Sequence, residues 1–253
     1  MVKGFELFQA RLGSFEDAYV VIGGTACDLA LKDFGGFRAT KDIDMLIVTE
    51  HVDVTFAKAL RDFLKEGSYT NYVTKDRKPH YYRFVAPKGS LYPAQIEMLS
   101  HSLIPERENV RFTPISLDDG IRSLSAIVLD SVYYEFVKTQ RDVSHGVPSL
   151  NPEALVVLKS AAYLNLLADR RRSPSSVRSE DLHKHRNDVF RLLGVIPSGE
   201  SIELPQSIRA RMDEFIRHMD VLNPEWADVA AAVGPLALSP ADYVERFRRL
   251  FAL

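Results

Sequence analysis

An apolar segment that carries two acidic residues constrains the fold of this chain more than any other feature. Residues 42–48 have the sequence DIDMLIV, which is typical of a buried β-strand. Successive side chains of a strand point to opposite faces, so we expect Asp42 and Asp44 on one face and Ile43 and Met45 on the other. Because burying an uncompensated carboxylate is costly, something must balance the charge of this pair.

Two carboxylates side by side suit a hard divalent cation. Mg²⁺ usually takes one or two carboxylates from the protein and its remaining ligands from substrate phosphates and water. Asp42 and Asp44 therefore predict a Mg²⁺ site that holds a nucleotide. The alternative is a chance Asp-x-Asp pair that binds no metal.

A glycine pair precedes the acidic strand. Residues 18–22 form a short apolar run that ends on Gly23 and Gly24, and glycine lets a ligand approach the main chain closely. We expect Thr25 to cap a helix over residues 26–32, whose first N–H groups would form an anion site suited to a triphosphate. A plain tight turn is the alternative for a lone glycine pair.

Two charged residues stand alone in apolar segments. Glu97 is the only acid in a predicted strand over residues 94–99, so it is either exposed on an edge strand or a third ligand for the same metal. Lys159 lies in an otherwise apolar predicted helix. Its ammonium group either points into a cleft or reaches the surface through its flexible stem.

Charged residues also gather near residues 170–188. The spacing of Asp181, Lys184 and Asp188 places them on one helical face, which alone is typical of a solvated face with salt bridges. The arginines 170–172 with residues 184–186 would form a basic surface for nucleic-acid phosphates if the intervening loop folds back. An ordinary solvated loop is the alternative.

Composition narrows the class of protein. The 253 residues are 46% hydrophobic and carry a formal net charge of -2, which leaves no global basic field to attract nucleic acid. The single cysteine, Cys27, excludes an internal disulfide framework and suits a reducing compartment. The sequence shows no signal-peptide pattern and no apolar membrane span, so we expect a cytoplasmic protein without membrane partners.

The pattern of elements predicts an α+β fold with a helical second half. A proline-bounded break at residues 146–152 suggests a mixed-sheet domain over residues 1–148 and a helical domain over residues 149–253. The apolar spacing predicts helices at residues 4–12, 26–32, 52–64, 132–141, 153–169, 180–193, 206–219 and 240 onward, with strands at 18–22, 42–48, 81–86 and 94–99. Residues 67–78 are expected to form a turn, and residues 115–121 a loop leading into an apolar segment at 124–129.

Three of these motifs together resemble a known family. The glycine pair with Thr25, the segment RATKDID at residues 38–44 and the segment QIE at residues 95–97 are similar to the glycines, paired acids and third acid of the polymerase-β-like nucleotidyltransferases. Their order and the downstream segments around Lys159 and residues 181–192 resemble the abortive-infection, AbiEii-type branch, whose members often act as toxins of toxin-antitoxin systems. The similarity extends over most of residues 18–193.

The resemblance implies a nucleotidyltransferase fold and a set of site residues. Glu97 stands where the superfamily often has aspartate, and Asp181 competes with Asp188 for the acidic role in the helical half. The implied catalytic residues are Asp42, Asp44, Glu97, Lys159 and Asp188, of which the first three would bind Mg²⁺. The implied nucleotide-binding residues are Gly23, Gly24, Thr25, Arg38 and Lys184.

The implied activity is transfer of a nucleoside monophosphate from a nucleoside triphosphate to an acceptor hydroxyl, with Mg²⁺ as cofactor. The 3′ end of transfer RNA is one acceptor that the resemblance implies, and a cognate antitoxin protein is an implied partner. Two alternatives stay open: a nucleotide-binding module without turnover, and a nucleotidyltransferase that acts on a protein or a small molecule.

Overall fold

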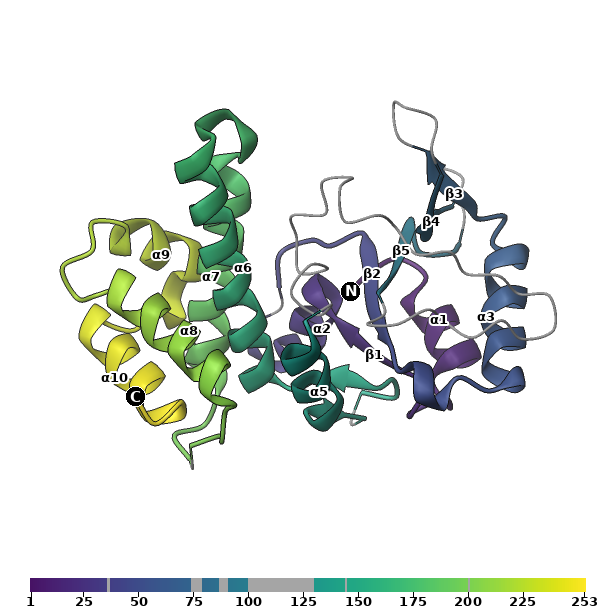
Figure 1. The fold of residues 1–253 in the computed structure, drawn as a ribbon, viewed down its shortest axis with the longest axis horizontal. Coiled ribbons are helices and arrows are strands. Elements are labelled where there is room, and N and C mark those ends of the chain that lie inside the picture. The colour runs from purple at the N-terminus through teal and green to yellow at the C-terminus, as the bar shows by residue number, and fades with distance from the viewer. Residues whose placement is uncertain (36, 74–78, 87–90, 100–129, 144, 200) are drawn as a thin grey trace. The chain divides into compact units, whose positions relative to one another are not determined.

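The structure, a computed structural model, describes residues 1–253 except 36, 74–78, 87–90, 100–129, 144 and 200 (Figure 1). The described residues form two compact units, one that extends to Asn151 and one that starts at Pro152. The first unit combines a mixed sheet with helices, whereas the second is helical. The chain is therefore α+β, and residues 149–151, expected in the second domain, group with the first.

A mixed sheet forms the centre of the first unit. The described strands are β1 (Tyr19–Ile22), β2 (Asp42–Ile47), β3 (Thr70–Val73), β4 (Pro79–Val85), β5 (Gln95–Leu99), β6 (Arg141–Asp142) and β7 (Ser149–Leu150). Their order across the sheet is β3-β4-β5-β2-β1-β7-β6. The pairs β2–β5 and β1–β7 are parallel and the others antiparallel. This order puts the acidic strand β2 next to β5.

The helices described in the first unit are α1 (Phe5–Leu12), α2 (Gly23–Ala30), α3 (Val54–Glu66) and α5 (Ser131–Thr139), with 3₁₀ turns at Lys32–Phe34 and Thr49–His51. Aromatic side chains join α1 and α3 to the sheet. The ring of Phe8 on α1 packs edge-on against both Tyr19 of β1 and Phe63 of α3. Tyr19 also stacks on Phe56 of α3. These contacts bury Tyr19, the first residue of β1, against α1 and α3.

Most of the elements predicted in this unit are confirmed. Helix α3 starts after Asp53, whose carboxylate accepts from the Phe56 N–H at the N-cap. The turn predicted over residues 67–78 is wrong in part, because residues 70–73 form β3. That strand pairs antiparallel with β4, and this tertiary pairing outweighs the polar composition of the segment. Residues 115–121 and 124–129 lie outside the described residues.

The second unit consists of helices α6 (Pro152–Arg172), α7 (Ser179–Val195), α8 (Gln206–His218), α9 (Trp226–Val233) and α10 (Pro240–Leu250), with 3₁₀ turns at Pro174–Ser176 and Gly234–Leu236. The long helices α6 and α7 run side by side as a hairpin (Figure 1). Phe190 of α7 packs against Phe215, Trp226 and Tyr243 from α8, α9 and α10. Helix α9 was not predicted from sequence periodicity. Its residue Trp226 is held in this aromatic cluster.

Among the described residues, every helix is too short or too polar to cross a lipid bilayer.

Candidate active site

The two aspartates of β2 lie on one face of the sheet, as predicted. Asp42 and Asp44 are half-buried, whereas Ile43 and Met45 between and after them are fully buried. The strand thus presents one polar and one apolar face at its N-terminal end. The polar face carries the two carboxylates that the candidate site needs.

Glu97 lies beside this pair and is inside the sheet. Strand β5 runs parallel to β2 with Asp44 opposite Glu97, and β4 flanks β5 on its other side. The exposed edge-strand interpretation of Glu97 is therefore wrong. Its Oε1 lies 2.8 Å from Nε of Arg83 on β4 and accepts a hydrogen bond of 2.7 Å from the amide of Gln95.

The glycine pair joins β1 directly to α2. Gly23 has φ of +69°, in the left-handed region that glycine favours, and the helix starts at this residue. A Cβ on Gly23 would lie 2.1 Å from Oδ2 of Asp44. The plain tight turn is thus wrong, because the glycine is a strand-to-helix junction packed on the acidic strand.

Thr25 does not cap the helix as predicted, because α2 starts at Gly23 and Thr25 lies within its first turn. Its hydroxyl instead donates a hydrogen bond of 2.7 Å to the main-chain carbonyl of Asp42. This bond ties the first turn of the helix to the start of β2. The residue at the N-cap position is Ile22, whose side chain offers no acceptor to the helix N–H groups.

The segment before β2 lies over the same helix start. A Cβ on Gly24 would meet the hydroxyl of Thr40 at 2.8 Å and a terminal nitrogen of Arg38 at 3.8 Å. The Arg38 guanidinium also lies over the ring of Phe37, 4.7 Å from its centroid. Arg38 therefore adds a positive charge near the N-terminus of α2, where the helix dipole already favours an anion.

The donor set fits a magnesium ion held partly by a substrate. Within the described ranges, no group of three or more His, Cys, Asp or Glu side chains is gathered closely enough to hold a metal by itself. Asp42 and Asp44 supply two carboxylates on one face, and Mg²⁺ commonly takes only one or two from the protein. The geometry suits a cation whose other ligands come from phosphate and water.

The residues predicted from the helical half lie in the second unit and bind each other. Nζ of Lys159 on α6 donates to Oδ2 of Asp188 on α7 at 2.8 Å, and the two side chains are 1% and 0% exposed. Oδ1 of Asp188 also lies 3.7 Å from Arg191. Lys159 thus does not reach the surface through its stem, and its expected contact with a triphosphate stays a prediction.

The other charges of the helical half are split between surface and core. Asp181 lies near the surface and pairs with Arg178 at 3.1 Å, while Lys184 is exposed. The basic surface considered for residues 170–172 with 184–186 is wrong in part, because His185 and Arg186 are buried. Arg186 instead donates to the Glu225 carboxylate at 2.6 Å.

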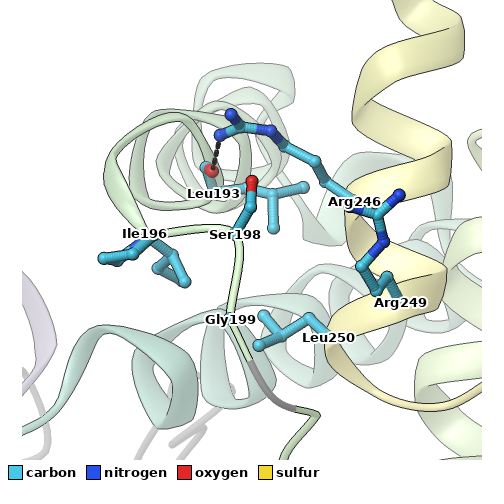
Figure 2. A pocket seen from close by; sticks show the side chains of 8 residues that line it. Leu193, Ile196, Ser198, Gly199, Arg246, Arg249 and Leu250 are labelled. Carbon is cyan, nitrogen blue, oxygen red and sulfur yellow. Dashed lines mark hydrogen bonds between the residues drawn. The ribbon is translucent and has the colours of Figure 1, made fainter.

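A small cavity in the second unit does not provide a nucleotide site (Figure 2). Its volume of about 20 Å³ holds roughly one water molecule. Arg246 points across it and donates to the carbonyl of Leu193 at the end of α7, and Arg249 pairs with Glu245. Both arginines thus bind acceptors within the helical unit.

Arg83 and Gln95 are the site residues that sequence reasoning missed. A signal was present, because Arg83 is the only charged residue in the predicted strand at 81–86, as Glu97 is in its own. Two lone opposite charges in apolar strands indicate that those strands could be neighbours.

No protein-family model, curated protein or solved structure matches this chain.

Proposed function

We propose that this protein is a Mg²⁺-dependent nucleotidyltransferase with a nucleotidyltransferase fold. The observation that carries the proposal is the junction of β1 and α2 against β2, which packs Gly23 on the Asp44 carboxylate. The helix start that we propose for anion binding and the acid pair that we propose for the cation are thereby adjacent in one unit. A nucleoside triphosphate with its magnesium ion needs both kinds of group side by side.

The proposed reaction is an in-line displacement at the α-phosphorus. The acceptor hydroxyl oxygen forms a bond to that phosphorus and loses its proton to solvent, while the bond to the oxygen bridging the α- and β-phosphorus breaks. Pyrophosphate leaves with the bonding electron pair, so atoms and charge balance. Positioning and charge stabilisation supply most of the acceleration in such a transfer.

Each part of the face has a role in this proposal. The first N–H groups of α2, from Gly24 and Thr25, bind the terminal phosphates, and Arg38 offsets their negative charge. Asp42 and Asp44 would hold Mg²⁺, which when bound neutralises phosphate charge and aligns the attacking and leaving oxygens. Removal of either carboxylate should therefore abolish transfer.

The acceptor and the biological role belong to the same proposal. We propose the 3′ end of transfer RNA as the first acceptor to test, and growth inhibition through its modification as the consequence. A cognate antitoxin protein stays a proposed partner. Support for these points comes only from the motifs that resemble AbiEii-type toxins.

Incubation with each labelled nucleoside triphosphate and a pool of cellular RNA tests the activity. We expect Mg²⁺-dependent pyrophosphate release and label transfer that are lost in Asp44→Asn. Asp62→Asn is the matched control, because it makes the same chemical change on helix α3 at a carboxylate that is 42% exposed. Equal signals from wild type and Asp44→Asn would contradict the proposal.

Two further outcomes separate the alternatives. Nucleotide binding without pyrophosphate release would favour a binding module, and label transfer to protein or a small molecule would replace the RNA acceptor. Expression of the wild type should inhibit cell growth, whereas expression of Asp44→Asn should not. A harmless wild type with full transferase activity would contradict the toxin role alone.

A further inference from the structure

Three charged side chains form a row across three neighbouring strands. Asp44 of β2 is opposite Glu97 of β5, and Glu97 is opposite Arg83 of β4. Residues directly opposite each other on paired strands point to the same face. The row therefore runs from Asp44 at the proposed cation site, through Glu97, to Arg83.

Arg83 lies within ion-pair distance of the acid. The Arg83 and Glu97 side chains are only 29% and 15% exposed, and Nε of Arg83 lies 2.8 Å from Oε1 of Glu97. The Gln95 amide donates to that same oxygen at 2.7 Å. An arginine stays protonated at any ordinary pH, so the ion pair is not broken by deprotonation of Arg83.

We infer that Arg83 is a positioning residue that keeps Glu97 out of the cation's ligand shell, so that Asp42 and Asp44 alone bind the divalent ion. This inference rests on the proposed function, because it concerns the same cation site. It assigns Glu97 a different role from that of a third metal ligand.

Charge and geometry support this assignment. Binding of the cation through Oε1 would compete with the contacts that this oxygen makes with Arg83 and Gln95, and binding through Oε2 would still bring the cation close to the Arg83 guanidinium. A guanidinium within contact distance of the carboxylate also opposes a second positive charge there. The contacts with Arg83 and Gln95 thus favour a cation displaced toward Asp42 and Asp44.

Binding of Mn²⁺ to the purified protein, followed by electron paramagnetic resonance of the free ion, tests the inference without any turnover. We expect Asp44→Asn to weaken Mn²⁺ binding by about tenfold or more. Glu97→Gln keeps the side-chain shape and removes only the charge, and should change affinity by no more than about twofold. Arg83→Gln should tighten binding by about threefold or more, because it releases the Glu97 carboxylate.

Three controls separate release of the Glu97 carboxylate from a loss of folding or a general charge effect. Arg83→Lys keeps the positive charge and should bind Mn²⁺ as wild type does, with the thermal midpoint reporting folding for each variant. The tightening in Arg83→Gln should persist at about 0.5 M salt, where exposed charge interactions are screened. The double variant Arg83→Gln/Glu97→Gln should lose the tighter Mn²⁺ binding of Arg83→Gln.

The outcomes are distinct. A loss in Glu97→Gln as large as that in Asp44→Asn would make Glu97 a ligand and overturn this inference while leaving the nucleotidyltransferase proposal intact. Unchanged affinity in Arg83→Gln would also overturn it. A wild type that binds no Mn²⁺, either alone or with a non-hydrolysable nucleoside triphosphate, would overturn the cation site itself, and both proposals with it.

Discussion

Gly23 and Asp44 are in such close contact that any side chain at position 23 would collide with the carboxylate, since a Cβ there would lie 2.1 Å from Oδ2 of Asp44. The positive φ of Gly23 adds a second reason for glycine at this junction. The start of α2 and the acid pair of β2 are thus fixed relative to each other.

Gly23→Ala should destabilise the first unit by about 2 kcal/mol or more and abolish nucleotidyl transfer, because it combines backbone strain with displacement of Asp44. Urea denaturation and the pyrophosphate assay measure the two effects. Gly35→Ala is the matched control, since Gly35 has φ of +92° but a Cβ there would meet no atom of the described residues within 4 Å. Equal losses in both variants would show that strain, and not the contact with Asp44, matters.

Lys159→Met should destabilise the second unit by about 3 kcal/mol, because it removes the ammonium group that lies 2.8 Å from the buried Asp188 carboxylate. The double variant Lys159→Met/Asp188→Leu should cost less than the sum of the single changes, since no buried charge then loses its partner. Chemical denaturation of the four proteins gives this coupling energy. Strict additivity would contradict the ion pair.

Glu50 should contribute pH-dependent stability. Although burial alone raises the pKa of this carboxyl, hydrogen bonds from Lys138 and Tyr134 lower it to about 2. The stabilisation is present above the ordinary pKa of 4.5 and is lost as pH falls toward 2. With the side chain 48% exposed, we expect Glu50→Gln to cost about 1 kcal/mol at neutral pH.

Urea denaturation of wild type and Glu50→Gln between neutral pH and pH of about 2 measures this loss. The difference should shrink through the acid range. Glu135→Gln is the control, because Glu135 binds the same Lys138 at 3.1 Å but is 65% exposed. A constant difference at every pH would indicate a contribution other than ionisation.

His218 should make the second unit sensitive to mild acid. Burial lowers its pKa, and the nearby Glu225 opposes that effect only in part. The unfolded chain therefore takes up the proton first, so stability should fall as pH drops below about 6.5. His218→Gln should flatten this dependence, and nuclear magnetic resonance of the imidazole should give a pKa below the ordinary value. A raised pKa would contradict this prediction.

Local features of the site were predictable from the sequence because they depend on short-range geometry. Alternation along β2 placed Asp42 and Asp44 on one face, and the apolar spacing gave α1, α3 and most of the second unit. The start of α2 was not predictable from glycine and threonine preferences alone. Packing against β2 let the helix begin at Gly23, which turned Thr25 into a hydrogen-bond donor to Asp42.

Pairings between distant segments were out of reach. The neighbours of Glu97 depend on which strands flank β5, and 29 positions separate the buried partners Lys159 and Asp188. A lone charge in an apolar segment shows that a partner is needed, but it does not say which one. The sequence therefore revealed the need for compensation in both cases, and its only indication of a partner was the lone charge of Arg83 in the strand predicted at residues 81–86.

The parallel pairing of β2 with β5 also affects how the protein acquires its site. The segments that contribute Asp44 and Glu97 are separated along the chain by α3 and the β3–β4 hairpin. Closing such a long-range contact is entropically slow compared with forming a helix or a hairpin. During synthesis, β1 and β2 therefore leave the ribosome before β5, and the row of Asp44, Glu97 and Arg83 can form only after β5 has emerged.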